Sequence, residues 1–192
     1  DHLTVSLDLN ATNGSVSIEG SLATYAPNAN YNGDDSFSFS VSDGSESSSA
    51  SVSLSVSAVN DAPVFITTFL PSIDEDIPYD FSVDVDDVDN LDDELDLSIL
   101  SGPSWLDLSG FTLFGTPGNN DIGSSTVLLN LTDGEISTSN TFELIVNPVN
   151  DAPVATTDLS GTTNEDQSIV IALSGSDIDG DALTFSLASD AT

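Results

Sequence analysis

The sequence predicts an all-β protein made of antiparallel strands. Apolar and polar residues alternate in segments such as 36–41 and 51–56, which places Phe, Val or Leu on one face of each strand and Ser on the other. Clusters of Gly, Asn, Asp and Pro separate these segments roughly every 8–12 residues. No apolar stripe of helical period is evident, so we expect half-buried strands that pack their apolar faces in a core.

The chain also repeats itself with a period of 90 residues. The segment VNDAPV at 59–64 returns at 149–154, and apolar positions of the intervening strands recur at the same offset. Residues 1–12 match residues 181–192 at twice this offset. A fixed period of this kind is the signature of domains arranged in tandem.

Both ends of the sequence fall inside a repeat. We therefore expect the C-terminal part of one domain at 1–63, a complete domain at 64–153, and the N-terminal part of the next at 154–192. A partial sandwich leaves strand edges open and is not expected to fold alone. Two explanations stay open: the sequence is an excerpt of a longer array, or residues 154–180 of one chain complete residues 1–63 of another by strand donation. Both predict a linear array whose partners are neighbouring repeats or head-to-tail copies of the same chain.

About seven strands in 90 residues are typical of an immunoglobulin-like (Ig-like) sandwich, here without a disulfide because Cys is absent. In the complete domain we expect strands at 64–70, 78–85, 94–100, 125–132 and 140–147, with two more between Trp105 and Phe114. Large aromatic side chains of such sandwiches usually pack in the interior. We therefore predict that Trp105 is a core residue.

The charge of the chain is almost entirely acidic. It has 33 Asp and Glu residues, one His and no Lys or Arg, which gives a formal net charge of −33. Because no side chain can neutralise phosphate groups, direct binding of nucleic acid is excluded, and docking on anionic lipid without a bridging cation is disfavoured. No apolar run is long enough to insert into a membrane. Any metal site must use oxygen ligands with, at most, His2.

No catalytic pattern is present in the sequence. His2 has no Ser-His-Asp arrangement around it, and there is no Lys base, Cys nucleophile or Gly-rich phosphate loop. We therefore predict that the protein is not an enzyme. An alternative is a carbohydrate-binding module of a secreted polysaccharide-active protein, in which Tyr25, Tyr31, Tyr79 and Trp105 would stack on a surface glycan. The expectation for these rings is that they are core or turn residues.

Acidic residues gather in the loops at both ends of the predicted sandwich. Because neighbouring strands alternate in direction, the loops that hold Asp87, Asp89 and Asp133 are expected at one end, beside the linker Asn60-Asp61. The residues expected at the other end are Glu75, Asp76, Asn150, Asp151, Asp177, Asp179 and Asp181.

Carboxylates at this density repel one another, since two unit charges 4 Å apart repel by roughly 4 kcal/mol at an effective dielectric constant near 20. The chain has no Lys or Arg that could offset this repulsion. Ca²⁺ binds six to eight oxygens of carboxylates, amides and carbonyls. The recurring acidic loops therefore predict calcium sites at the domain junctions. The alternative is that these residues only solvate loops, where Asp, Asn and Gly are common turn residues.

Several motifs resemble those of bacterial cadherin-like tandem repeats of the tandem-95 type, which occur in large surface adhesins and extracellular repeat proteins. The motifs are VNDAP at 59–63, YAPNANYNGDDSF at 25–37, NEDQS at 164–168 and SDIDGDALTF at 176–185. The complete domain is similar to the dystroglycan-type cadherin-like variant. Its motifs are PSWL at 103–106, FGTP at 114–117, DIG at 121–123 and TDG at 132–134.

This resemblance implies tandem cadherin-like sandwiches with Ca²⁺ bound between domains, which stiffens a linear array. By position, the implied ligands of one junction are Glu75, Asn150, Asp151, Asp177 and Asp179. Those of the other junction are Asn60, Asp61, Asp87, Asp89 and Asp133. The resemblance further implies an extracellular place on a bacterial cell surface, and a role in adhesion as a rigid spacer or a filament-forming array.

Overall fold

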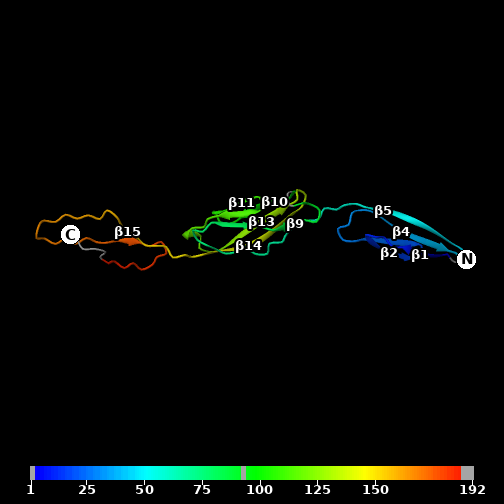
Figure 1. Ribbon diagram of the computed structural model, residues 1–192, viewed down its shortest axis with the longest axis horizontal. Helices are drawn as coiled ribbons and strands as arrows, with labels where there is room; N and C mark the ends of the chain where they lie inside the picture. Colours follow the sequence, from blue (N-terminus) through cyan, green and yellow to red (C-terminus); the bar gives the residue numbers. More distant parts are fainter. Residues whose placement is uncertain (1–2, 92–93, 187–192) are drawn as a thin grey trace. The chain divides into compact units, whose positions relative to one another are not determined.

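Strands make up most of the backbone between Thr4 and Asn147, where apolar and polar residues alternate, and the described residues beyond Asn147 contain only the two-residue strands Val154–Ala155 and Gly175–Ser176 (Figure 1). The computed structural model describes residues 3–91 and 94–186, and the chain divides into two units, residues 1–61 and residues 62–192. No α-helix occurs in these described ranges. Among the same residues, no helix is long and apolar enough to cross a membrane. The prediction of an all-β fold is confirmed.

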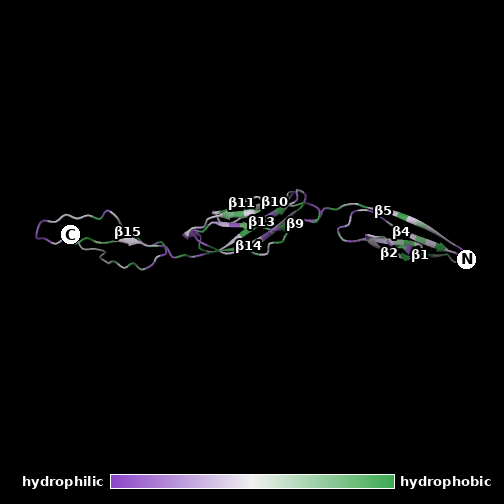
Figure 2. Ribbon diagram, viewed as in Figure 1, coloured by the Kyte–Doolittle hydropathy of each residue, from purple (hydrophilic) through white to green (hydrophobic). Residues whose placement is uncertain are grey.

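Unit 1 consists of a three-stranded antiparallel sheet and a separate hairpin. The sheet has the order β1–β4–β5, with bounds Thr4–Leu9, Gly33–Ser42 and Ser47–Val56. The hairpin joins β2 (Gly14–Glu19) to β3 (Leu22–Pro27). Its turn contains Gly20, whose φ of 61° is a left-handed value that glycine adopts without steric cost. Hydrophobic and hydrophilic residues alternate along β5 (Figure 2).

A buried carboxylate, Asp35 at the start of β4, holds the parts of unit 1 together. The backbone N–H groups of Thr12 and Asn13 donate hydrogen bonds to its two oxygens (3.1 and 3.0 Å), and the Tyr25 hydroxyl donates to Oδ2 (3.0 Å). Burial of Asp35 raises its pKa. The hydrogen bonds from the backbone of Ser36, Asn13 and Thr12 and from Tyr25 outweigh this effect, so the pKa of Asp35 lies below its ordinary value.

Unit 2 contains the more complete sandwich. One sheet has the order β10–β13–β14–β7, with bounds Asp96–Ser101, Gly123–Thr132, Ser137–Asn147 and Ile73–Asp74. The second sheet has the order β11–β12–β8, with bounds Leu106–Ser109, Thr112–Gly115 and Tyr79–Ser82. Two short pairs add β6 (Val64–Phe65) to β9 (Val85–Asp86) and β15 (Val154–Ala155) to β16 (Gly175–Ser176). A 3₁₀ turn, η2, spans Asn119–Asp121.

The core of unit 2 lies between its two sheets. Leu113 of one sheet and Leu129 of the other are fully buried, as are their neighbours Leu131 and Leu144. Trp105 packs against this core, with its ring edge-on to that of Tyr79 at a centroid distance of 6.0 Å. The prediction that Trp105 is a core residue is confirmed. The core therefore includes the buried rings of Tyr79 and Phe142, against which the partly buried Trp105 and Phe65 pack.

The two units share strand pairings at positions 90 residues apart. β4 and β13 begin and end at this offset, and Phe37 pairs with Val52 as Val127 pairs with Phe142. The hairpins β2–β3 and β11–β12 pair at the same offset. The pairings agree with the repeat found in the sequence. The boundaries 1–63, 64–153 and 154–192 and the linear array of repeats stay predictions.

The prediction of a strand at 64–70 is wrong beyond Phe65, where β6 ends. The N–H groups of Ile66 and Thr67 both donate to the Asp84 carbonyl (2.9 and 3.0 Å), which breaks the regular hydrogen-bond pattern of a strand pair. Further on, Pro71 has no N–H group with which to hydrogen-bond a neighbouring strand. The chain then crosses to the other sheet, where β7 pairs in parallel with β14. The other expected strands of this unit appear near their predicted positions, and that at 78–85 is divided into β8 and β9.

Replacing Asp35 with Asn should lower the melting temperature (Tm) of unit 1 at pH 7, because an amide cannot accept all of these hydrogen bonds. A lowered pKa means that folding favours the ionised form. Ionised Asp35 therefore stabilises the fold above pH 3.8, the pKa of this group in the unfolded chain. This stabilisation is lost as the pH falls through the lower pKa of the folded state. The Tm difference between wild type and Asp35→Asn, followed by circular dichroism of the full chain, should shrink below pH 3.8.

Asp34→Asn is the matched control, because Asp34 is exposed on the same strand. We expect this variant to unfold at nearly the wild-type Tm throughout the pH range. Equal Tm values for wild type and Asp35→Asn at pH 7 would contradict the role given to Asp35.

Candidate metal site

Three acidic side chains meet where the sandwich of unit 2 joins the segment that follows it. Glu75 comes directly after β7, Asp151 lies in the linker between β14 and β15, and Asp179 lies in the loop after β16. One carboxylate oxygen of each lies within 4.8 Å of the others. The sequence expectation placed these residues at one junction, and the structure brings them together.

Glu75 is the buried member of this cluster. Its side chain is fully buried, and its Oε1 accepts a hydrogen bond from the Val149 N–H (2.7 Å). Its Oε2 is buried as well and has no hydrogen-bond partner among the described residues. An ionised oxygen in this state is unfavourable without a compensating charge or donor, so a cation beside Glu75 would stabilise it. The chain has no Lys or Arg to supply one.

The backbone beside Glu75 directs the next carboxylate away from the core. Asp76 has a φ of 60°, a left-handed value that Asp adopts more readily than most residues, and its N–H donates to the Pro117 carbonyl (2.8 Å). Asp76 lines a hollow of about 520 Å³ together with Asp151 and Asp177. At this turn, therefore, Glu75 is buried in the sandwich, whereas Asp76 lines the hollow beside it.

The loop after β16 is folded by one of its own carboxylates. Asp177 Oδ1 accepts hydrogen bonds from the N–H groups of Asp179 (3.0 Å) and Asp181 (3.2 Å). This turn directs Asp179 toward the linker, where its Oδ2 accepts a hydrogen bond from the Asp151 N–H (2.7 Å). Asp181 enters these contacts through its backbone. The Asn150 side chain donates to the Asp151 carbonyl (2.9 Å) and so shapes the linker.

The electrostatics of the cluster are repulsive. The pKa of Asp151 is raised by burial and then by the charges of Asp179, Asp76, Glu75 and Asp177, in that order. Every one of these neighbours belongs to the set predicted from the sequence. When these carboxylates are all ionised, they repel one another unless a cation lies among them.

The donor set fits a hard divalent cation. Its atoms are carboxylate oxygens, which suit Ca²⁺ and Mg²⁺ better than softer metals. A Ca²⁺ ion with ligands at 2.3–2.6 Å holds opposed oxygens roughly 5 Å apart, and the 4.8 Å span of Glu75, Asp151 and Asp179 lies within that limit. The unpartnered oxygen of Glu75 is the feature of the fold that an ion would satisfy.

Asn119 is a residue of this site that the sequence did not reveal. It lies in η2, lines the same hollow, and its Nδ2 donates to Asp179 Oδ1 (3.3 Å). The position 90 residues earlier is Ala29, so the repeat contains no signal for it. Asn119 contributes a neutral donor that holds the Asp179 carboxylate in place.

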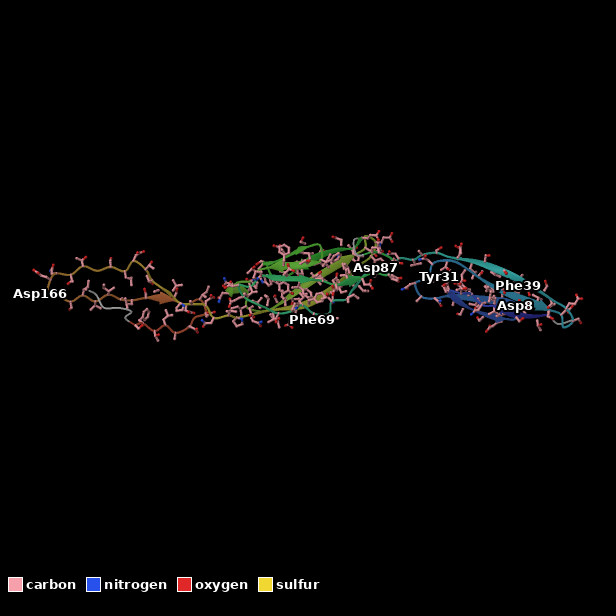
Figure 3. The ribbon with its side chains drawn as sticks, viewed as in Figure 1. Asp8, Tyr31, Phe39, Phe69, Asp87 and Asp166 are labelled. Carbon is pink, nitrogen blue, oxygen red and sulfur yellow. The ribbon has the colours of Figure 1, made fainter. Side chains whose placement is uncertain are left out.

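Three residues of the second predicted set, Asp87, Asp89 and Asp133, lie in unit 2. Asp87 lies at one end of this sandwich (Figure 3), and its Oδ1 accepts hydrogen bonds from the N–H groups of Asp89 (2.8 Å) and Asn90 (3.2 Å). Its Oδ2 is buried without a hydrogen-bond partner in the described ranges. Asp133 Oδ1 accepts from the Ile136 N–H (2.6 Å) and so supports the β13–β14 turn. A metal role for these residues stays a prediction.

The linker of unit 1 repeats the local geometry of the linker in unit 2. The Asn60 side chain donates to the Asp61 carbonyl at 3.0 Å, as Asn150 does to Asp151 at 2.9 Å. This agreement describes the backbone turn of the two linkers. The assignment of Asn60 and Asp61 as metal ligands stays a prediction.

The tyrosines proposed as sugar-stacking residues are engaged in the fold. Tyr79 is buried in the core, and burial raises its pKa to about 12. The hydroxyl of Tyr25 donates to Asp35, and that of Tyr31 donates to the Asp34 carbonyl (2.6 Å). These contacts support the expectation that the rings are core or turn residues.

Two family models match the chain. A model described as a bacterial Ig domain matches residues 1–55 and 150–192, together just over half of the sequence, and a model described as a putative Ig domain matches residues 62–147. No curated protein shows significant similarity to the chain. The Ig models confirm the predicted resemblance to bacterial Ig-like and cadherin-like repeats.

Solved structures of cadherin domains resemble the chain in fold. Mouse protocadherin-24 EC1-3 has a TM-score of 0.53 at 19% identity, covering 93% of this chain and 66% of that one. Extracellular cadherin domains 1–4 of protocadherin gamma B7 have a TM-score of 0.51 at 17% identity, covering 93% and 48%. The predicted Ig-like or cadherin-like sandwich is therefore confirmed.

A lower likeness is found to an endo-fucoidan hydrolase from glycoside hydrolase family 107. Its identity is 26%, its TM-score is 0.41, and the match covers 78% of this chain but 24% of the hydrolase. The chain therefore spans about a quarter of the length of that enzyme. The likeness is too low to indicate a shared activity.

In a chelator, Asp151→Asn should raise the Tm of unit 2 at pH 7, because it removes a charge that its neighbours repel. The raised pKa of Asp151 means that the folded state binds the proton more tightly than the unfolded chain. The wild type therefore regains this stability as the pH falls toward 3.8, and the advantage of the variant should vanish there. Scanning calorimetry in EDTA between pH 7 and 3.5 would measure both effects.

Asp107→Asn on β11 is the matched control, since it removes one charge from an exposed site of the same unit. Its Tm should change little. A gain in Asp107→Asn equal to that in Asp151→Asn would show that net charge, and not the cluster, is responsible.

Proposed function

Because the chain belongs to the bacterial Ig domain family, we propose that it is a non-enzymatic structural or adhesive repeat region in which Ca²⁺ stiffens the connection between consecutive domains. The domain type itself supports a structural or adhesive repeat. The observation that carries the calcium proposal is the buried, unpartnered Glu75 Oε2 beside Asp151 and Asp179. Bacterial Ig and cadherin-like domains are typically extracellular, and we place this region at the bacterial cell surface.

The proposed ion would join three parts of the chain. Glu75 belongs to the sandwich, Asp151 to the linker and Asp179 to the segment that follows. Asp76 and Asp177 line the same hollow and could supply further oxygens, as could Asn150. Carboxylates that repel one another in the absence of the ion would all be attracted to the bound Ca²⁺. The linker that holds Asp151 would therefore bend less freely.

The extracellular setting suits this arrangement. Extracellular calcium modules bind with dissociation constants of roughly 10⁻⁴–10⁻³ M, well matched to the Ca²⁺ available outside cells. Because the chain has no Lys or Arg, no ammonium or guanidinium group of the chain competes with Ca²⁺ for these carboxylates. We propose neighbouring repeats of the same protein as its partners.

Millimolar Ca²⁺ should raise the Tm of the wild-type chain above its value in EDTA. A ligand present at 100 times its dissociation constant adds about 2.7 kcal/mol to the stability of the state that binds it. Glu75→Gln should lose most of this gain, because it removes the buried charge while it keeps the shape of the side chain. Asp107→Asn should keep the gain. Calorimetric titration with CaCl₂ and MgCl₂ would measure affinity and ion preference.

Identical unfolding in EDTA and in Ca²⁺ would overturn the calcium proposal. Unchanged Ca²⁺ affinity in Glu75→Gln would contradict the site assignment even if Ca²⁺ stabilises the chain.

Ca²⁺ should also slow hydrogen exchange at two specific linker amides. The Val149 N–H donates to Glu75 and the Asp151 N–H donates to Asp179, so each is held by a carboxylate that the ion would order. We expect protection of both amides to rise at least tenfold with Ca²⁺, as measured by NMR exchange. The amide of Glu46, which donates to Asp43 in the β4–β5 turn (2.9 Å), should change much less.

A further inference from the structure

The segment 117–121 is hydrogen-bonded to both sides of the acidic cluster. On the side of the sandwich, the Pro117 carbonyl accepts a hydrogen bond from the Asp76 N–H (2.8 Å). On the side of the following segment, the Asn119 side chain donates through Nδ2 to Asp179 Oδ1 (3.3 Å). The segment therefore connects the turn after β7 with the loop after β16.

This segment is held in shape by its own contacts. Pro117 is fully buried, which anchors the start of the segment in the sandwich. The Asp121 N–H donates to the Gly118 carbonyl (2.8 Å), and Asp121 Oδ2 accepts a hydrogen bond from the Gly118 N–H (2.9 Å). These reciprocal bonds close η2, which contains Asn119 and leaves its neighbour Asn120 exposed. The backbone of Asn119 is thus fixed by contacts that do not involve the acidic cluster.

Asp179 is the member of the cluster that most needs such support. Glu75 is buried in the sandwich, whereas Asp179 is exposed. An exposed carboxylate beside like charges is repelled outward unless hydrogen-bond donors hold it. Its Oδ1 accepts from Asn119 and its Oδ2 accepts from the Asp151 N–H (2.7 Å). These two donors keep Asp179 at the cluster, where one of its oxygens lies within 4.8 Å of those of Glu75 and Asp151.

We infer that Asn119 is a positioning residue that sets the calcium affinity of this junction, because it holds Asp179 at the site before an ion binds. The inference rests on the proposed calcium function. A preorganised ligand loses less freedom when the ion binds, and removal of a residue that orients a metal ligand typically lowers metal affinity by about 10- to 100-fold. The amide of Asn119 attracts Asp179 and adds no negative charge to the cluster.

The geometry also determines what a carboxylate at position 119 would do. The distance of 3.3 Å from Asn119 Nδ2 to Asp179 Oδ1 is close to the separation of about 3.4 Å between adjacent oxygen ligands of a Ca²⁺ ion. An oxygen in place of Nδ2 would therefore lie where it can share an ion with Asp179. Without an ion, the same two oxygens would repel each other. Asn119→Asp should therefore destabilise the junction in EDTA and strengthen its binding of Ca²⁺.

The test measures Ca²⁺ affinity of the full chain by calorimetric titration and exchange of the Asp151 amide in EDTA by NMR. Asn119→Ala should weaken Ca²⁺ binding by about 10-fold. It should also speed exchange of the Asp151 amide in EDTA, because the Asp179 carboxylate that accepts this N–H is held less firmly. Asn119→Asp should lower the Tm in EDTA and bind Ca²⁺ about 10-fold more tightly than the wild type, since a further charged ligand raises affinity.

Asn120→Ala and Asn120→Asp are the matched controls, because they make the same changes at the exposed neighbour of Asn119 in η2. Both should keep nearly the wild-type affinity and the wild-type exchange of the Asp151 amide. Asn119→Asp keeps the inference falsifiable if Asn119→Ala disturbs the fold, because a structural defect alone does not tighten binding.

The inference alone is overturned if the wild type binds Ca²⁺ and Asn119→Ala binds it equally well, if Asn119→Asp binds it more weakly, or if the Asn120 variants show the same changes as the Asn119 variants. A wild-type chain that binds no Ca²⁺ would overturn the proposed calcium function and this inference with it.

Discussion

The need to cover one apolar face of each sheet governs the structure of this chain. Period-two alternation gives each long strand one apolar side, and that side is stable only when a second layer excludes water from it. Unit 2 meets this requirement with β8, β11 and β12, so Leu113, Leu129 and Leu144 are fully buried. In unit 1 the same strand pairing leaves Phe39 half-buried.

Charge imposes a second constraint, because the chain has no basic side chain to pair with its carboxylates. Many of them are instead held by backbone N–H groups. Asp35 ties the loop before β2 to β4, Asp87 and Asp177 fold their own loops, and Asp133 supports a hairpin turn. Hydrogen bonds of this kind stabilise the ionised form. Where several carboxylates converge, one oxygen of Glu75 has no donor among the residues that the structure describes, so backbone groups do not satisfy the whole cluster.

The sequence was sufficient to predict the fold class, most strands of the complete sandwich and the cluster around Glu75. Each of these depends on local alternation or on a motif that recurs after 90 residues. The break in the strand at 64–70 was missed, because it depends on two N–H groups that share the Asp84 carbonyl. Asn119 was missed because its counterpart in the repeat is Ala29. The role of Asp35 depends on donors from three separate segments, which no spacing in the sequence reveals.

The parallel pairing of β7 with β14 has a consequence for how unit 2 bears mechanical load. The chain enters this sandwich at β6, continues into β7 and leaves the sandwich directly after β14, so tension that reaches β7 and β14 would pull these two strands in opposite directions. The bonds between them, including Asn147 Nδ2 to Asp74 (3.0 Å) and Glu75 N–H to the Asn147 carbonyl (3.0 Å), lie across that direction and are loaded together in shear. Glu75 ends this set of bonds and begins the acidic cluster. Under such tension, the same residue would connect the loaded strands to the linker that follows the sandwich.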